Sequence, residues 1–153
     1  MKFKLLLALA ALLLVIQVFR PAKNLGVAEP FTGPNEITVL HPASPEVKQI
    51  LAVACYDCHS NRTRYPWYAE VQPVSWWLAN HIRDGKRHLN FSEFGTYNAK
   101  RQAKKLDEIV DEVKDHGMPL SSYTLVHADA RLTEAQIAAL CRWVESAQSP
   151  KDK

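Results

Sequence analysis

The stretch Cys55-Tyr56-Asp57-Cys58-His59 carries the strongest signal in this chain of 153 residues. The spacing C-x-x-C-H places two thiols where they can bond the vinyl groups of one haem, and the adjacent imidazole where it can bind the iron. The order matters because two intervening residues match the separation of the sulfur atoms to the porphyrin edge. The motif therefore predicts one covalent haem c, attached through Cys55 and Cys58, with His59 as the proximal iron ligand.

Two other uses of a C-x-x-C pair, a redox pair and a structural zinc site, fit the surrounding sequence less well. A thioredoxin-like redox pair belongs to a βαβ pattern, whereas the residues before Cys55 have helical periodicity and no parallel-strand runs follow. A zinc site needs a second pair of ligands at short spacing, and the third cysteine, Cys141, stands far away and alone. A single remaining thiol also implies no disulfide framework.

The N-terminus carries an apolar run of 15 residues from Leu5 to Phe19, interrupted only by Gln17. Such a run is an export signal or a membrane anchor. Its short length favours a cleaved signal peptide. Arg20 and Lys23, however, occupy the place of a small-residue cleavage pattern and favour an uncleaved anchor, which we expect over residues 1–20.

Covalent haem belongs to an oxidising, exported compartment, so the motif predicts a protein on the periplasmic side of the bacterial inner membrane. Cleavage of the leader would instead leave a soluble periplasmic protein. The formal net charge of +3 comes from three basic residues of the leader, Lys2, Lys4 and Arg20, so the remaining chain is neutral. No basic stripe interleaved with aromatic residues is present, and we expect no nucleic-acid partner.

Turn-forming residues and helical periodicity divide the rest of the chain. Four prolines and two glycines predict an extended linker over residues 21–43, and a haem-binding domain follows over 44–147 with a polar tail over 148–153. The periodicity predicts helices from Ser44 to the motif, from Pro73 to Gly85, from Lys100 to His116 and from Thr133 to Ser146. We therefore expect an all-α fold, a small cytochrome c-like bundle of about four helices around one haem, preceded by a membrane helix and the extended linker.

A second iron ligand is needed for a low-spin electron carrier. Met118 is the one methionine besides the initiator, and the segment Gly117-Met118-Pro119 would project its thioether from a defined loop. A core-filling methionine is the alternative. Four histidines are rival ligands, of which His81 is the most serious because it shares a helix with two tryptophans; the others are His88, His116 and His127. His41, in the linker, is expected to be solvated.

The environment of the haem is less determined by the sequence. The aromatic residues near the motif, which could line the macrocycle or pack in a core, are Tyr65, Trp67, Trp76 and Trp77. The side chains that could donate hydrogen bonds to the propionates, or face solvent, are Arg62, Arg64, Arg83 and Asn90.

The chain resembles the small class I c-type cytochromes and, more closely, the bacterial haem-binding domain family. The resemblance covers roughly residues 40–146 and is carried by Cys58-His59-Ser60-Asn61, Tyr65-Pro66-Trp67-Tyr68, Pro73-Val74-Ser75-Trp76, His81-Ile82, Leu89-Asn90-Phe91-Ser92 and Met118-Pro119-Leu120. Gln17 and Arg20-Pro21 in the leader are similar to the family's membrane-tethered members. The resemblance implies an all-helical monohaem domain outside the inner membrane of a Gram-negative bacterium, and it implies little about redox partners.

These observations predict a membrane-tethered periplasmic cytochrome that carries one electron at a time and is not an enzyme. The alternative is a haem enzyme, peroxidase-like, or a gas or redox sensor, in which the distal position is open or loosely held and His81 or another side chain acts on bound oxygen species. A third possibility is a structural or assembly protein in which haem only completes the core.

Overall fold

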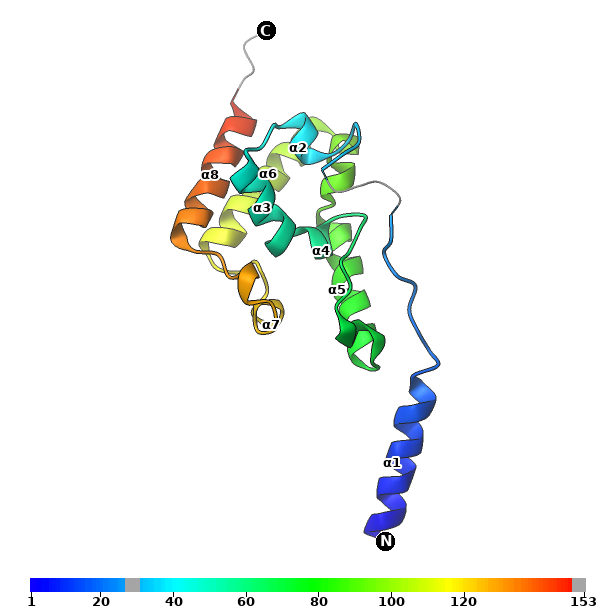
Figure 1. The fold of residues 1–153 in the computed structure, drawn as a ribbon. Helices are drawn as coiled ribbons and strands as arrows, with labels where there is room; N and C mark the ends of the chain where they lie inside the picture. Colours follow the sequence, from blue (N-terminus) through cyan, green and yellow to red (C-terminus); the bar gives the residue numbers. More distant parts are fainter. Residues whose placement is uncertain (27–30, 150–153) are drawn as a thin grey trace.

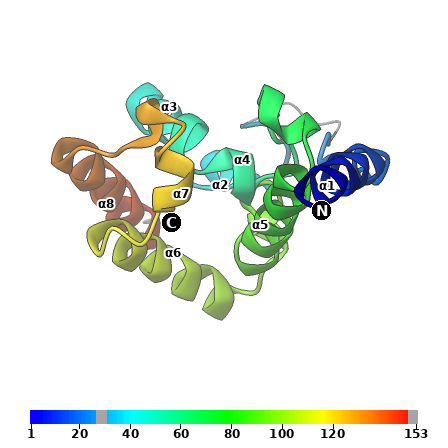
Figure 2. The ribbon, with the colours of Figure 1, turned by 90° about the horizontal axis from the view of Figure 1, so that it is seen from below.

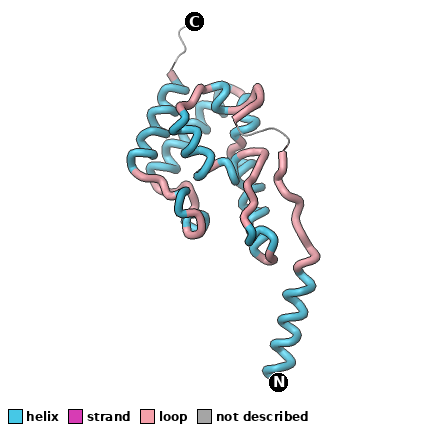
Figure 3. The backbone as a smooth tube through the Cα atoms, viewed as in Figure 1, coloured by secondary structure: helices cyan, strands magenta, loops and turns pink. Residues whose placement is uncertain are grey.

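The computed structural model describes residues 1–26 and 31–149, and over these residues the protein contains helices and no strand (Figure 3). The expected all-helical fold is thus confirmed. The α-helices are α1 (Lys2–Ile16), α2 (Ile37–Leu40), α3 (Pro45–Ala54), α4 (Tyr56–His59), α5 (Val74–His88), α6 (Ala99–Lys114), α7 (Ser121–Thr124) and α8 (Glu134–Gln148). The short 3-10 helices are η1 (Trp67–Glu70), η2 (Phe91–Thr96) and η3 (Ala128–Ala130). Pro30 of the expected linker and residues 150–153 of the expected polar tail lie outside the described residues.

The main core lies where α8 packs against α6 and α3 (Figure 1). The residues of these helices that are buried in the core include Val47, Ile50 and Leu51 of α3, Leu106 and Val113 of α6, and Ile137, Leu140, Cys141 and Val144 of α8. A smaller cluster of Ala69, Leu78 and Ile82 joins α5 to η1. The haem motif lies between these two clusters, because Cys55 packs against the first and Cys58 against the second.

The structure confirms the predicted starts of two helices, α3 and α8. The Ser44 hydroxyl accepts a hydrogen bond of 3.2 Å from the Val47 amide at the start of α3. Thr133 and Gln136 form a reciprocal capping box at the start of α8. Each cap satisfies amides that have no partner inside the helix, which fixes where the helix begins.

The expected extended linker is wrong for residues 36–40. Glu36 caps α2, and Glu36, Ile37 and Thr38 are buried. Ile37 belongs to the main core, so the ordered domain begins before Ser44. His41 is also not simply solvated, because its ring is half-buried and packs edge-on against Phe94 with ring centroids 5.9 Å apart.

The first helix, α1, is apolar on every side after Lys2 and Lys4 of its first turn, and none of its residues is buried. Within the described ranges, no helix combines the length and the hydropathy required to cross a membrane. Figure 1 shows α1 leading away from the base of the domain. The segment that follows α1 is held against the domain, since Asn24 bonds through its side chain to the Ser60 carbonyl and the Thr63 hydroxyl, at 2.9 Å each.

Glu36 gives the fold a pH dependence that can be measured. Burial raises the pKa of the Glu36 carboxyl, although the Tyr56 hydroxyl donates a hydrogen bond to it. The folded state therefore favours the protonated acid, and Glu36 stabilises the fold fully at pH values below its ordinary pKa of 4.5. This contribution to the unfolding free energy is lost as the pH rises through the raised pKa of the folded state. Gln at this position keeps an oxygen for Tyr56 and cannot ionise.

We expect the Glu36→Gln variant to gain stability relative to the parent as the pH rises from about 4 to about 8. Urea unfolding of both proteins across this range measures the difference in unfolding free energy. Glu145→Gln, at an exposed carboxyl of α8, reports the general effect of removing one negative charge. A difference between Glu36→Gln and the parent that stays constant with pH would contradict the assignment.

Candidate haem-binding site

Residues of α4, α5, α6 and α7 line a cavity of about 380 Å³. Figure 2 shows how these four helices are arranged in the domain. The volume of the cavity falls in the range of pockets that hold small ligands and cofactors. All four residues that the sequence predicted as haem contacts line this cavity: Cys55, Cys58, His59 and Met118. The fold therefore brings together two segments that lie about sixty residues apart in the sequence.

The motif is held in a short helical turn. Cys55 ends α3, and its carbonyl accepts hydrogen bonds from the amides of Cys58 at 3.2 Å and of His59 at 3.0 Å. Helical geometry places residues three and four apart on the same face. Both thiols and the imidazole therefore reach the same cavity, as attachment to one planar ring requires.

His59 is oriented for binding a metal. Its Nδ1 lies 3.0 Å from the carbonyl oxygen of Leu89, which can only accept, so Nδ1 carries the proton and donates. The unprotonated Nε2 is left as the ligand atom, and a backbone carbonyl behind the ring is the usual support for a metal-bound histidine. Burial lowers the pKa of His59, so the neutral form that can bind a metal is favoured.

Burial also governs the two thiols. It raises the pKa of Cys55 to about 12 and the pKa of Cys58 to about 11. Redox-active C-x-x-C pairs work through a thiol whose pKa is lowered. The environment therefore disfavours a thioredoxin-like use of this pair. Among the described residues, no group of three or more His, Cys, Asp or Glu side chains is arranged to hold a metal ion.

Gly85 allows α5 to approach the motif. A Cβ atom on Gly85 would stand 2.7 Å from the carbonyl oxygen of Cys58, which is closer than real side chains come to backbone. The prediction that Gly85 ends its helix is wrong, because α5 continues to His88. The glycine is there because two backbones touch, and a glycine in a helix costs stability unless it has such a reason.

Asp57 connects the motif to the other side of the cavity. Its buried carboxylate accepts hydrogen bonds from the Arg64 amide at 3.0 Å and the Arg64 guanidinium at 3.1 Å. It also accepts one of 2.8 Å from the Tyr123 hydroxyl on α7. Since α7 follows directly after Met118-Pro119-Leu120, this contact fixes the distance between the two halves of the site. Nothing in the sequence indicated that Asp57 would join two segments so far apart.

Met118 is placed by the end of α6. The amides of Gly117 and Met118 both donate to the carbonyl of Glu112, at 2.9 and 3.1 Å. The chain turns out of the helix at His116, which has a left-handed φ of 55°. The backbone of Met118 is thus bonded to the helix, and its side chain lines the cavity.

The rival histidines separate into two groups. His81 and His88, both on α5, line the same cavity as Met118, whereas His116 and His127 are not among its lining residues. His127 instead stacks on Tyr123 and hydrogen-bonds the Tyr68 hydroxyl at 2.6 Å. His81 Nδ1 lies 2.9 Å from the Trp77 carbonyl, which leaves its Nε2 as the free nitrogen.

The lining of the cavity differs from the expectation. The candidate aromatics Tyr65, Trp67, Trp76 and Trp77 and the candidate donors Arg62, Arg64, Arg83 and Asn90 are not among its lining residues. Phe91 and Tyr123 supply the aromatic surface, and Lys105 is a basic group on the wall. Residues near the motif in sequence were the natural guess, but α6 and α7 supply one wall of the cavity, and the positions of these helices depend on tertiary packing.

These features define an all-helical domain whose cavity presents two thiols, a metal-ready imidazole and a thioether. The donor set and the apolar walls fit a haem. The chain belongs to the haem-binding domain family, whose profile matches residues 11–146. Comparisons with curated proteins and with solved structures gave no match.

The Gly85 contact predicts an unusual response to alanine. Alanine normally stabilises a helix by about 1 kcal/mol relative to glycine. We expect Gly85→Ala to lower the unfolding free energy by about 1–3 kcal/mol instead, because the added methyl group meets the Cys58 backbone. Urea unfolding monitored by circular dichroism measures the change.

Gly117→Ala is the matched control, since the nearest atom to its Cβ is a carboxylate oxygen of Glu112 that can rotate away. We expect it to change stability far less than Gly85→Ala. If Gly85→Ala were as stable as the parent or more stable, α5 and α4 would not be in backbone contact.

Proposed function

We propose that this protein is a monohaem c-type cytochrome that accepts and donates one electron at a time on the periplasmic side of the inner membrane. The observation that carries the proposal is the meeting of the C-x-x-C-H motif and Met118 in one cavity. A haem bound there supplies the one-electron chemistry of its iron. The membership of the haem-binding domain family supports the cofactor.

The residues of the chain have distinct roles under this proposal. Cys55 and Cys58 hold the haem through thioether bonds, formed when each S–H adds across a vinyl double bond without any oxidant. His59 Nε2 is the proximal ligand and Met118 Sδ the distal ligand, which together favour a low-spin iron with a raised potential. Phe91, Ile109 and Val113 keep water from the cavity, since each lines it with an apolar side chain.

The location follows from the chemistry of attachment and from the leader. Covalent haem requires an exported chain, and α1 is apolar on every side beyond Lys2 and Lys4 of its first turn, as a segment in a bilayer must be. The family profile begins at residue 11, inside α1, which supports a leader that stays with the domain. We therefore propose that α1, with the apolar residues after it, tethers the protein to the inner membrane. The redox partner is a protein of unknown identity.

The second candidate function is a haem sensor or peroxidase-like enzyme. It is favoured by one observation: His81 and His88 share the cavity with Met118, so a side chain other than the ligand could act on a molecule bound at an open distal position. The two functions differ in whether the sixth ligand is firmly bound.

Spectra of the purified haem-loaded chain and its variants test the proposal. The parent should show a low-spin spectrum, titrate reversibly as a one-electron couple and bind carbon monoxide poorly. Met118→Ala should become high-spin, bind carbon monoxide and have a lower potential, while Met118→His should stay low-spin at a lower potential. His81→Ala and His88→Ala are the matched controls and should resemble the parent.

Two results would contradict the assignment in different ways. A parent that is five-coordinate and binds carbon monoxide readily would favour the sensor or enzyme. A Met118→Ala variant identical to the parent, together with a high-spin His81→Ala variant, would show that the ligands are two histidines.

A further inference from the structure

The end of the domain nearest α1 exposes a group of large apolar side chains. Three of the four tryptophans of the chain lie within residues 67–77, and Trp67 is 81% exposed. We name the exposed apolar side chains of this segment the tryptophan patch: Trp67, Val71, Val74, Trp76 and Trp77. None of these side chains lines the haem cavity.

Hydrogen bonds attach this patch to the base of α1. The backbone amide of Gln72 donates a hydrogen bond to Gln17 Oε1 at 2.9 Å, and Gln17 Nε2 donates one to the Gln72 carbonyl at 3.3 Å. The Trp76 indole N–H donates to the Phe19 carbonyl at 2.6 Å. The patch is therefore continuous with the exposed apolar surface of α1, which ends beside it (Figure 1).

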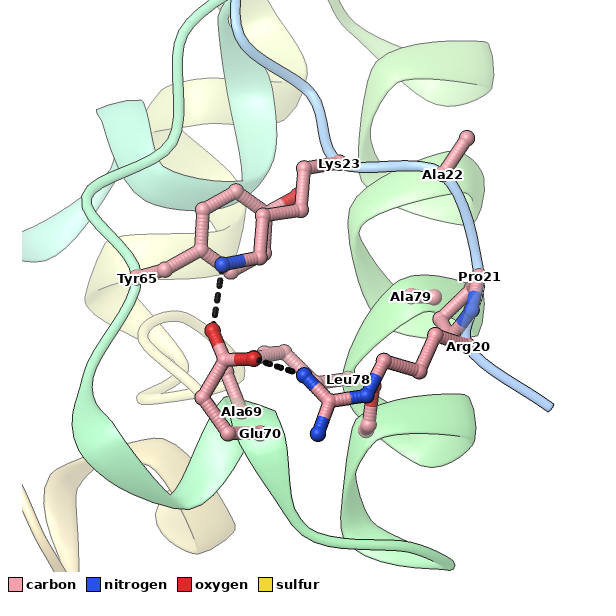
Figure 4. A pocket seen from close by; sticks show the side chains of 10 residues that line it. Arg20, Pro21, Ala22, Lys23, Tyr65, Ala69, Glu70, Leu78 and Ala79 are labelled. Carbon is pink, nitrogen blue, oxygen red and sulfur yellow. Dashed lines mark hydrogen bonds and ion pairs between the residues drawn. The ribbon is translucent and has the colours of Figure 1, made fainter. Parts of the chain in front are cut away.

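Charge at this end is arranged so that no lone carboxylate faces outward. Glu70 is the only charged residue of the segment 67–77. It pairs with Arg20 at 2.7 Å and with Lys23, and the three side chains lie together in Figure 4. The Lys23 ammonium holds the pKa of Glu70 below its usual range. The pairing therefore neutralises the one group that an anionic lipid surface would repel.

The length of α1 points to the occupant of the patch. With 15 residues it is about 22 Å long, whereas the apolar core of a bilayer is about 30 Å thick. A short apolar segment is accommodated by drawing its flanking residues toward the bilayer or by thinning it. The residues that flank α1, in space, are those of the tryptophan patch.

We propose that the tryptophan patch is a membrane-contact surface that rests in the interfacial layer of the lipid bilayer. This inference rests on the tether of the proposed function. Tryptophan is enriched at this depth because its ring is apolar and its N–H is polar. Since α5 starts in the patch and rises about 1.5 Å per residue, His81 in the cavity wall stands roughly 10 Å above it along the helix. Contact with the membrane thus sets the distance from the bilayer surface at which a partner protein reaches the cavity.

Depth measurements on the full haem-loaded chain in vesicles of phosphatidylethanolamine and phosphatidylglycerol test the proposal. A nitroxide is attached in turn to Trp67→Cys, to Val39→Cys and to Leu9→Cys. Val39 is exposed on α2, at the end of the domain remote from α1, and serves as the matched control. Leu9 reports α1 itself. The unaltered chain serves as the control for background labelling, because Cys141 is buried. Under the proposed function the two cysteines of the motif are bonded to haem and do not react with the label.

The readout is the ratio of collision with oxygen, which concentrates in lipid, to collision with a water-soluble nickel complex. Each collision value is a difference from the agent-free sample, so relaxation by the iron cancels. We expect the ratio at residue 67 to exceed that at residue 39 several-fold and to lie below that at residue 9.

Equal ratios at residues 67 and 39, with a high ratio at residue 9, would overturn the membrane-contact surface and leave the tether intact. Low ratios at all three positions would overturn the tether together with this inference.

Discussion

The contact of α5 with the backbone of Cys58 is the constraint on which the site depends. Gly85 removes the side chain that would separate the two helices. This close approach brings the end of α5 next to the motif, where the Leu89 carbonyl can accept a hydrogen bond from His59 Nδ1. One packing contact therefore sets both the position of Cys58, a proposed attachment residue, and the orientation of His59, the proposed proximal ligand.

The opposite wall of the cavity depends on a second, polar constraint. Asp57 lies inside the motif, yet its carboxylate reaches Tyr123 on α7, beyond Met118. Its bonds to Arg64 satisfy the remaining lone pairs of a buried charge, without which burial would be costly. The two halves of the candidate ligand set are thus joined by the protein, before any cofactor links them.

The sequence predicted the features that depend on local chemistry. The motif, the Met118 loop and the caps at Ser44 and Thr133 are all signals within a few residues. It did not predict α2, because prolines around it suggested a linker while the burial of Ile37 depends on distant helices. The sequence predicted that Gly85 ends a helix, whereas it lies at a close backbone contact inside α5. A single sequence does not distinguish these two reasons for a glycine.

The cavity walls were also beyond the reach of the sequence. The tryptophans next to the motif were natural candidates for the haem environment, yet they are exposed at the end of the domain nearest α1 and do not line the cavity. Their place beside α1 is the basis for proposing that they contact the membrane.

The central claim is that Cys55 and Cys58 hold a haem covalently in this cavity, and mass spectrometry tests it most directly. The peptide that contains residues 55–59 is isolated from protein matured in cells that attach haem c, after acid-acetone extraction. We expect the mass of the peptide plus one haem from the parent, and the mass of the bare peptide from the Cys55→Ala, Cys58→Ala double variant. A bare peptide from the parent, with the haem in the organic phase, would contradict the claim.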